Sequence, residues 1–185
     1  MPPISPCVPQ DLPAFEAPAN CLNEPGRIIA VALFKISEFD FVSGDWADPT
    51  KWAPKITAGD IVIIKPVTGE FPEPSEVTVD GDGLVRTVRT GTDYDVSYSH
   101  RGVDDNIDFY SVLNGSNNEY SAGFVFPDFS IYLAADKQNN LIPVTFNARP
   151  MAESSLTSQR RFMVNARWSC IDLPRVHKVP RSLFV

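Results

Sequence analysis

The feature that most constrains the fold is a strict alternation of apolar and polar residues near the C-terminal end of the chain. From Arg161 to Cys170 the sequence reads RFMVNARWSC. The apolar positions of this stretch are Phe162, Val164, Ala166 and Trp168. Because a β-strand directs alternate side chains to opposite faces, we predict a strand here with one face in the core. Cys170 continues the inward set and is interpreted as a small buried residue.

A second alternation lies between Leu84 and Gly115 and predicts another part of the same scaffold. Its apolar face carries Tyr94, Val96 and Tyr98, and its polar face carries Asp93, Asp95, Ser97 and Ser99. We interpret this region as two strands followed by a helix over about 104–114. Asp104 or Asp105 is the predicted N-cap of that helix, and Gly115 is predicted to lie just beyond its end.

The proline content sets the fold class. The chain of 185 residues holds 17 prolines and 10 glycines, too many for a helix bundle, while its 43% hydrophobic content is too high for disorder. We therefore predict an α+β, mainly β domain, an antiparallel β-sandwich or barrel with one flanking helix. Further strands are expected at 27–34, 61–65, 76–79, 120–126, 129–133 and 141–148. A short or kinked helix is predicted between Asp48-Pro49 and Gly59, because Pro54 interrupts it.

The two ends of the chain are predicted to form extended arms around a single body at 26–173. Residues 1–25 contain seven of the prolines, which forbid a helix there. Residues 174–185 form a second, basic arm. Residues 1–150 hold 10 basic against 21 acidic side chains, whereas residues 151–185 hold 6 against 2. An acidic body argues against non-specific DNA binding, and a basic tail suits docking on an acidic neighbouring copy or is simply solvated.

No motif in the chain indicates catalysis or a bound cofactor, so we predict that it is not an enzyme and holds no metal. His100 and His177 have no second ligand at metal-binding spacing and are interpreted as ordinary surface histidines. The stretch Asp80-Gly81-Asp82-Gly83 lacks the remaining ligands of a calcium loop and reads as a tight turn. Cys7 and Cys21 either pair across the first arm or stay reduced.

Three segments carry a resemblance to a known group of proteins. These are DWADPTKWAPKITAGDIVIIKPVTGEFPEPSEVTVDGDG, TGTDYDVSYSHRGVDDNIDFYSVLNGSNN and RRFMVNARWSCIDLP, which lie within residues 27–174. They resemble virion structural proteins of tailed bacteriophages, in particular those of Bacteroidetes phages including the crAss-like group. The order of strands, helix and strands is also similar to the tail-tube fold, in which a β-sandwich with one flanking helix assembles into stacked rings.

The resemblance implies a structural component of the virion, made in the cytoplasm of the host bacterium. The expected assembly is a homo-oligomeric ring or tube in the tail, collar or neck, through which DNA passes. Expected partners are copies of itself and other virion proteins, with no membrane. Hypothetical assembly residues are Pro6, Pro9, Pro13, Phe15, Arg175, Lys178, Arg181 and Phe184. Asp93 and Asp95 are a hypothetical acidic lining, since basic walls would retain DNA.

Two alternatives remain open at this point. Instead of a ring or tube subunit, the chain could be a capsid-associated auxiliary protein, or it could be a β-sandwich module that binds carbohydrate or peptide. For the binding module, Trp46, Trp52 and Trp168 offer aromatic rings for a sugar platform, although Trp168 lies on the apolar face of a strand and is predicted to be core.

Overall fold

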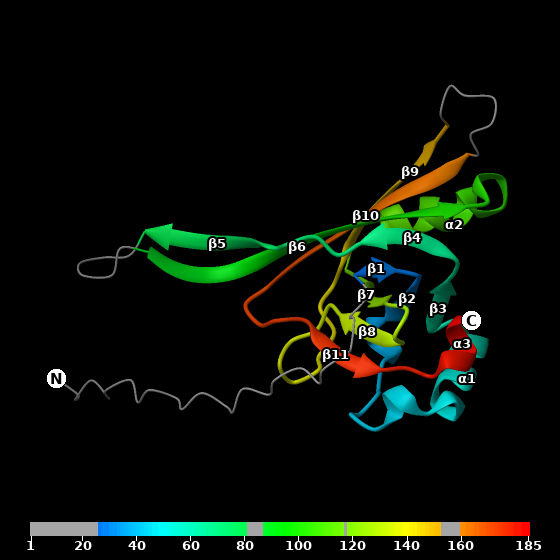
Figure 1. The fold of residues 1–185 in the computed structure, drawn as a ribbon, viewed down its shortest axis with the longest axis horizontal. Coiled ribbons are helices and arrows are strands. Elements are labelled where there is room, and N and C mark those ends of the chain that lie inside the picture. Colours follow the sequence, from blue (N-terminus) through cyan, green and yellow to red (C-terminus); the bar gives the residue numbers. More distant parts are fainter. Residues whose placement is uncertain (1–25, 81–86, 117, 153–159) are drawn as a thin grey trace.

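The computed structural model describes residues 26–80, 87–116, 118–152 and 160–185. Two separate antiparallel sheets pack face to face as a sandwich (Figure 1). This confirms the mainly β prediction and decides between its two forms, because the sheets do not close into a barrel. Pro6, Pro9, Pro13, Phe15, the Cys7 and Cys21 pair and most of the turn at 80–83 lie outside the described residues.

The first sheet contains both strands that were predicted from alternation. Its order is β1 (Arg27–Ile28), β4 (Val67–Glu70), β6 (Thr87–Arg101), β10 (Arg161–Cys170) and β9 (Thr145–Met151), and β5 (Ser75–Asp80) pairs with β6 beyond β4. The second sheet has the order β11 (Arg175–Lys178), β8 (Ser130–Leu133), β7 (Tyr120–Val125), β2 (Ala30–Lys35) and β3 (Ile61–Ile64).

The helices are α1 (Pro49–Ala58), α2 (Val103–Gly115) and α3 (Arg181–Phe184), with short 3-10 turns η1 (Ile36–Glu38) and η2 (Asp45–Ala47). The single flanking helix predicted at 104–114 is α2, and α1 adds a second of ten residues. In the described part of the chain, no helix has the length and apolar character needed to cross a bilayer.

The core has two parts, one on each side of the second sheet. Between the sheets, the Trp168 ring stacks on those of Tyr94 (4.8 Å between centroids) and Phe124 (5.7 Å). On the other face, Phe34, Trp46 and Trp52 meet edge to face beneath α1 and η2. Strand β2 contributes to both parts, which explains its uninterrupted apolar sequence.

Strand β6 corrects the prediction of two strands before α2. It is one strand of fifteen residues. Thr90 and Gly91 lie at a β-bulge, where the pairing with β5 shifts between Val77 and Thr78. A bulge accommodates one extra residue in one strand and leaves the chain direction unchanged.

Prolines explain two other differences from the predicted strands. Strand β4 was not predicted, and it forms because Pro66 and Pro72 flank the strand without entering it. Strand β9 begins at Thr145 rather than Leu141, since Pro143 precedes it and cannot donate to a sheet.

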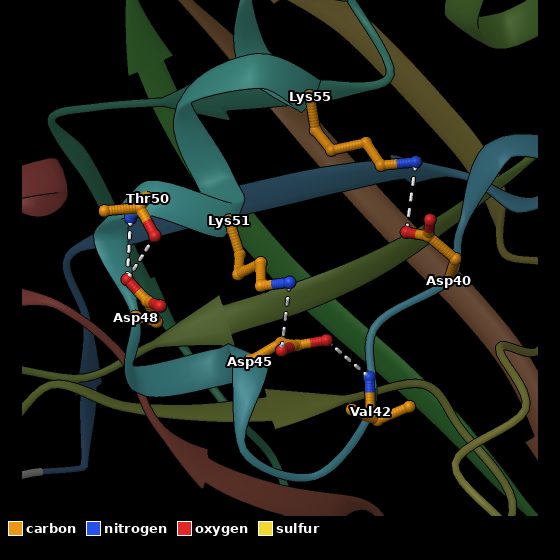
Figure 2. Close-up of polar contacts among 7 residues, drawn as sticks. All are labelled: Asp40, Val42, Asp45, Asp48, Thr50, Lys51 and Lys55. Carbon is orange, nitrogen blue, oxygen red and sulfur yellow. Dashed lines mark hydrogen bonds and ion pairs between the residues drawn. The ribbon is translucent and has the colours of Figure 1, made fainter.

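Helix α1 begins and ends as predicted. The Asp48 carboxylate accepts hydrogen bonds from the backbone N–H (2.9 Å) and hydroxyl (2.7 Å) of Thr50, and Gly59 ends the helix with φ 83° (Figure 2). The helix continues through Pro54. Figure 2 also shows the preceding loop held by Lys55, whose Nζ lies 3.0 Å from the Asp40 carboxylate.

The cap prediction for α2 was wrong. Gly102, with φ 86°, is the N-cap. Asp104 and Asp105 lie in the first turn, where the helix dipole stabilises their negative charge. The left-handed backbone at this sharp corner after β6 requires a residue without a side chain. Gly115 is the last helical residue and Ser116 is the C-cap.

Candidate assembly surface

A two-stranded ribbon projects from one end of the sandwich (Figure 1). It consists of β5 and residues 87–91 of β6, because β10 covers β6 only from Thr92 onward. All six residues of β5 are exposed, including Val77 and Val79 at 36% and 51%. The ribbon therefore presents apolar side chains to solvent with no strand outside β5 in the described chain.

The ribbon and the approach to it are acidic. Four carboxylates and no basic residue occur in 70–80, namely Glu70, Glu73, Glu76 and Asp80. Arg89, on β6, is the basic side chain of the ribbon's described part, and its guanidinium donates to the Thr92 hydroxyl. This end of the protein thus combines carboxylates with exposed valines.

Asp93 and Asp95, the predicted acidic lining, lie on the exposed outer face of the first sheet, away from the second sheet. The charge of Asp95 is paired, because its carboxylate accepts a hydrogen bond from Arg167 Nε at 2.7 Å. Asp93 accepts from the Ser169 hydroxyl. The structure therefore groups the two residues on one open face but gives that face mixed charge.

Arginines gather at the opposite end of this outer face. Arg101 lies directly opposite Arg161 across the β6–β10 pair, and Arg149 on β9 is diagonal to Arg161. We call Arg101, Arg149 and Arg161 the arginine end. The Arg149 guanidinium also donates to the Asn147 side chain at 3.0 Å. The outer face consequently runs from Asp93 and Asp95 near the ribbon to arginines at the far end.

The free edge of β9 is blocked by a side chain that sequence reasoning missed. Asn114, in the last turn of α2, donates from Nδ2 to the Ala148 carbonyl (3.0 Å) and accepts the Ala148 N–H at Oδ1 (2.7 Å). The amide thus occupies the position of a neighbouring strand, which protects an edge against pairing with another chain. No sequence pattern links Asn114 to Ala148, which are brought together only by packing.

The predicted C-terminal assembly residues contact their own chain. Strand β11 pairs with β8, so residues 175–178 are extended but lie along the body and do not project from it. Lys178 Nζ lies 2.6 Å from the Asp128 carboxylate, and Arg175 Nε donates to the Asp136 carbonyl at 3.2 Å. The reason is charge complementarity between a basic tail and an acidic body within one copy.

The last residues of the chain close over the aromatic core. Arg181 lies over the Phe129 ring, and Phe184 is buried against Trp52. Lys65 Nζ donates to the backbone oxygens of Leu183 and Val185, both at 3.0 Å. Phe184 therefore belongs to the core of its own chain, which corrects the prediction that it contacts neighbouring copies.

Asp128, which binds this segment, has a perturbed acidity. Burial alone would raise the pKa of Asp128, but hydrogen bonds from Lys178 and Ser130 outweigh it and lower the pKa to about 2. The carboxylate therefore stays ionised in all but strongly acidic solution.

Neither histidine is an ordinary surface residue, contrary to prediction. His177 stacks on Trp46 with centroids 4.9 Å apart and planes 9° apart, and its Nε2 lies 3.2 Å from Asn139 Oδ1. Burial, with a smaller effect of Arg175, lowers the pKa of His177. His100 faces Tyr110, and burial lowers the pKa of its imidazole too.

The tryptophan platform of the binding-module alternative is absent, since Trp46, Trp52 and Trp168 are all buried. A pocket of about 390 Å³ lies elsewhere, between the start of β1 and strands β8 and β11. Phe71, Phe126 and Tyr132 line it together with Asp128 and Lys178. Within the described ranges, no three His, Cys, Asp or Glu side chains gather as a metal site would require.

These features define a class of protein, a two-sheet antiparallel β-sandwich with a projecting acidic ribbon and a closed C-terminal segment. Compared with protein-family models, with curated proteins and with solved structures, the chain matches none.

Proposed function

We propose that this protein is a structural subunit of a tailed-phage virion that repeats as a ring or tube in the tail, collar or neck. The resemblance of its three segments to virion proteins of Bacteroidetes phages supports this function. The structural observation that carries the proposal is the ribbon of β5 and residues 87–91, with Val77 and Val79 exposed on it.

A two-stranded ribbon is at best marginally stable in water on its own. Its backbone edge and apolar side chains gain stability when another surface covers them. A subunit that repeats supplies such a surface on the next copy, so the ribbon is ordered by assembly. Val77 and Val79 join the hypothetical assembly residues of the N-terminal arm in this proposal.

The partly neutralised outer face also suits a conduit. Asp93 and Asp95 supply negative charge, while Ser97 and Ser99 continue the same face as neutral hydroxyls. Such a surface repels phosphate weakly and binds it little, so DNA passes without being retained.

Electron microscopy of the purified full chain, and of phage particles that contain it, tests the proposal. We expect rings or short tubes, and density for the sandwich in the tail, collar or neck. Protein that stays monomeric at high concentration and is missing from particles would refute it. A variant lacking residues 1–25 should keep the folded body and lose assembly if the N-terminal arm contributes, and normal rings from that variant would remove the arm from the proposal.

The pocket lined by Phe71, Phe126 and Tyr132 favours one second candidate, a module that binds carbohydrate or peptide. Aromatic rings beside the Asp128 carboxylate and the Lys178 ammonium suit sugar hydroxyls. Glycan-array binding by a monomer, lost on changing Tyr132 to Ala, would support this candidate over the virion subunit.

A further inference from the structure

An apolar groove lies between α2 and the free edge of the second sheet. Two adjoining hollows, of about 320 and 270 Å³, share Val62 of β3 and Phe109 of α2 in their linings and so form one groove. Leu33 and Tyr120 line the larger hollow, and Val112 of α2, also in its lining, is 70% exposed. We call this the α2–β3 groove. It presents aliphatic and aromatic side chains to a partner.

The backbone of β3 borders the groove. Among the described strands, β3 is the last of its sheet and pairs only with β2. Val62 and Ile64 pack in the core between the sheets and Ile63 packs in the other part of the core, yet all three line the smaller hollow. The groove therefore follows the edge of the strand. An extended segment there gains hydrogen bonds from β3 N–H groups as well as apolar contacts.

We propose that residues 3–9 of a second copy bind in this groove. The inference rests on the proposed function and names the surface that the N-terminal arm contacts. Residues 3–9 read PISPCVP, in which Pro3, Pro6 and Pro9 recur every three residues. This is the period of a polyproline II helix, so the spacing puts the three rings along one edge of such a helix. Grooves lined by aromatic side chains recognise segments of this kind, which lose little conformational entropy on binding.

The length of the segment fits the groove. Residues 3–9, as polyproline II at about 3.1 Å per residue, extend about 20 Å. Helix α2 has 13 residues and, at about 1.5 Å per residue, is also about 20 Å long. The segment therefore runs the length of the helix that forms one wall of the groove.

Charge selects this part of the chain. The acidic residues of α2 are Asp104, Asp105 and Asp108, and Asp108 lines the groove. Arg160 offsets one of them, since its guanidinium lies 2.7 Å from the Asp104 carboxylate. Residues 1–10 contain no acidic or basic side chain, whereas residues 11–25 and the ribbon both contain carboxylates. An acidic wall repels carboxylates, so the groove favours the uncharged segment.

The basic side chains in the lining do not reverse this selection. Lys65 Nζ donates to the backbone oxygens of Leu183 and Val185, so its positive charge is directed at the C-terminal segment of its own chain. His100 also lines the smaller hollow, and burial lowers the pKa of its imidazole, which keeps the ring neutral at pH 7.

The segment leaves the body at the edge of the second sheet that is opposite the groove. Gly26, the first described residue, lines the pocket beside β8 and β11. Strands β11 and β8 are first in the order of this sheet and β3 is last. Residues 10–25 span at most about 50 Å, enough to reach the β3 edge of a copy that lies beside the first. Such a contact between two different surfaces is heterologous, and it generates a ring when the rotation closes.

Disulfide trapping tests where the segment binds. Cys7 lies within residues 3–9 and serves as the probe in a full-length chain that carries Cys21→Ser and Cys170→Ala. Adding Val112→Cys puts a second thiol in the groove. Mild oxidation should then give covalent dimers and longer ladders on non-reducing gels. The matched control is Ser111→Cys, an exposed position of α2 outside the groove lining, which should give far fewer.

Self-association tests what the contact contributes. Val112→Asp puts a carboxylate in the apolar groove, and Ser111→Asp has the same net charge with the groove intact. We expect association, followed by sedimentation velocity, to weaken on the order of tenfold or more in Val112→Asp and to stay near the wild-type level in Ser111→Asp. Deletion of residues 3–9 should weaken it to a similar degree. Circular dichroism of each variant checks that the sandwich is folded.

The outcomes separate this contact from the proposed function. Loss of both thiols without a dimer band would place the segment in the groove of its own chain and overturn the contact between copies. Equal trapping at the two cysteine positions, or equal association of the two aspartate variants, would also overturn it. Normal rings from a chain lacking residues 3–9 would remove the contact and leave the virion subunit standing. A wild-type chain that neither associates nor enters particles would overturn both.

Discussion

Replacing Asn114 with alanine removes the side chain that closes the edge of β9, and the structure sets the size of the effect. Two hydrogen bonds to Ala148 are lost, of 2.7 and 3.0 Å, and Ala148 is only 6% exposed. Each such bond stabilises a protein by about 1 kcal/mol, so we expect a loss of about 2 kcal/mol in the free energy of unfolding. For a chain of this size that corresponds to a fall in Tm of about 4–8 °C.

Urea denaturation followed by tryptophan fluorescence measures this loss, because Trp46, Trp52 and Trp168 are buried and report on both parts of the core. Asn165→Ala is the matched control, since it removes an amide from the outer face of the same sheet. Asn114→Asp keeps an acceptor for the Ala148 N–H but loses the donor, so it should be destabilised as well. An Asn114→Ala free energy within about 0.5 kcal/mol of the wild type, the range of ordinary surface changes, would refute the reasoning.

Three further predictions concern His177, Gly69 and Phe184. Because the pKa of His177 is lowered in the folded state, its contribution to stability is complete above about pH 6.5 and is lost as the pH falls through the folded pKa. His177→Phe should keep the stack on Trp46 and reduce the difference in urea midpoint between pH 7.5 and 5.5. An unchanged difference would contradict this prediction. Gly69→Ala places a Cβ 2.6 Å from the Ser97 carbonyl oxygen and should cost about 1–3 kcal/mol in a thermal melt, so wild-type stability would count against the close approach of β4 and β6. Phe184→Ala should cost about 3 kcal/mol and speed amide hydrogen exchange in β11, whereas unchanged exchange would mean that α3 does not hold that strand.

The periodicity of apolar residues was sufficient to predict the strands that have one face in solvent and the other in the core. Strand β10 and the C-terminal half of β6 were predicted with their inward faces, because alternation is imposed by the pleat and one face is buried. Helix α1 was predicted from Asp48, Pro49 and Gly59, whose cap chemistry is local. Strands β4 and β11 were missed because their sequences, VTGE and RVHK, each contain one apolar residue, so that pairing with a partner strand sets their extended conformation.

The candidate surface was predictable only in part. Asp93 and Asp95 were placed correctly on an exposed polar face, but the pairing of Asp95 with Arg167 depends on the register of β6 against β10. The arginine end depends on the same register, since Arg101 and Arg161 are 60 residues apart in the chain. Arg175, Lys178 and Phe184 were predicted to lie in a basic arm that contacts other copies. Composition does not distinguish an arm that docks on a neighbouring copy from one that docks on its own chain.

The sequence by itself determined that this chain is a mainly β protein, which of its strands have a buried face, and that its charge is divided between an acidic body and a basic C-terminal end. These properties follow from short-range geometry and from composition. Tertiary structure alone decided that the C-terminal segment closes over Trp46 and Trp52, that Asn114 blocks the edge of β9, and that carboxylates and arginines lie at opposite ends of one sheet. Each of these depends on residues far apart in the chain, whose proximity is set by strand register and by the packing of the two sheets.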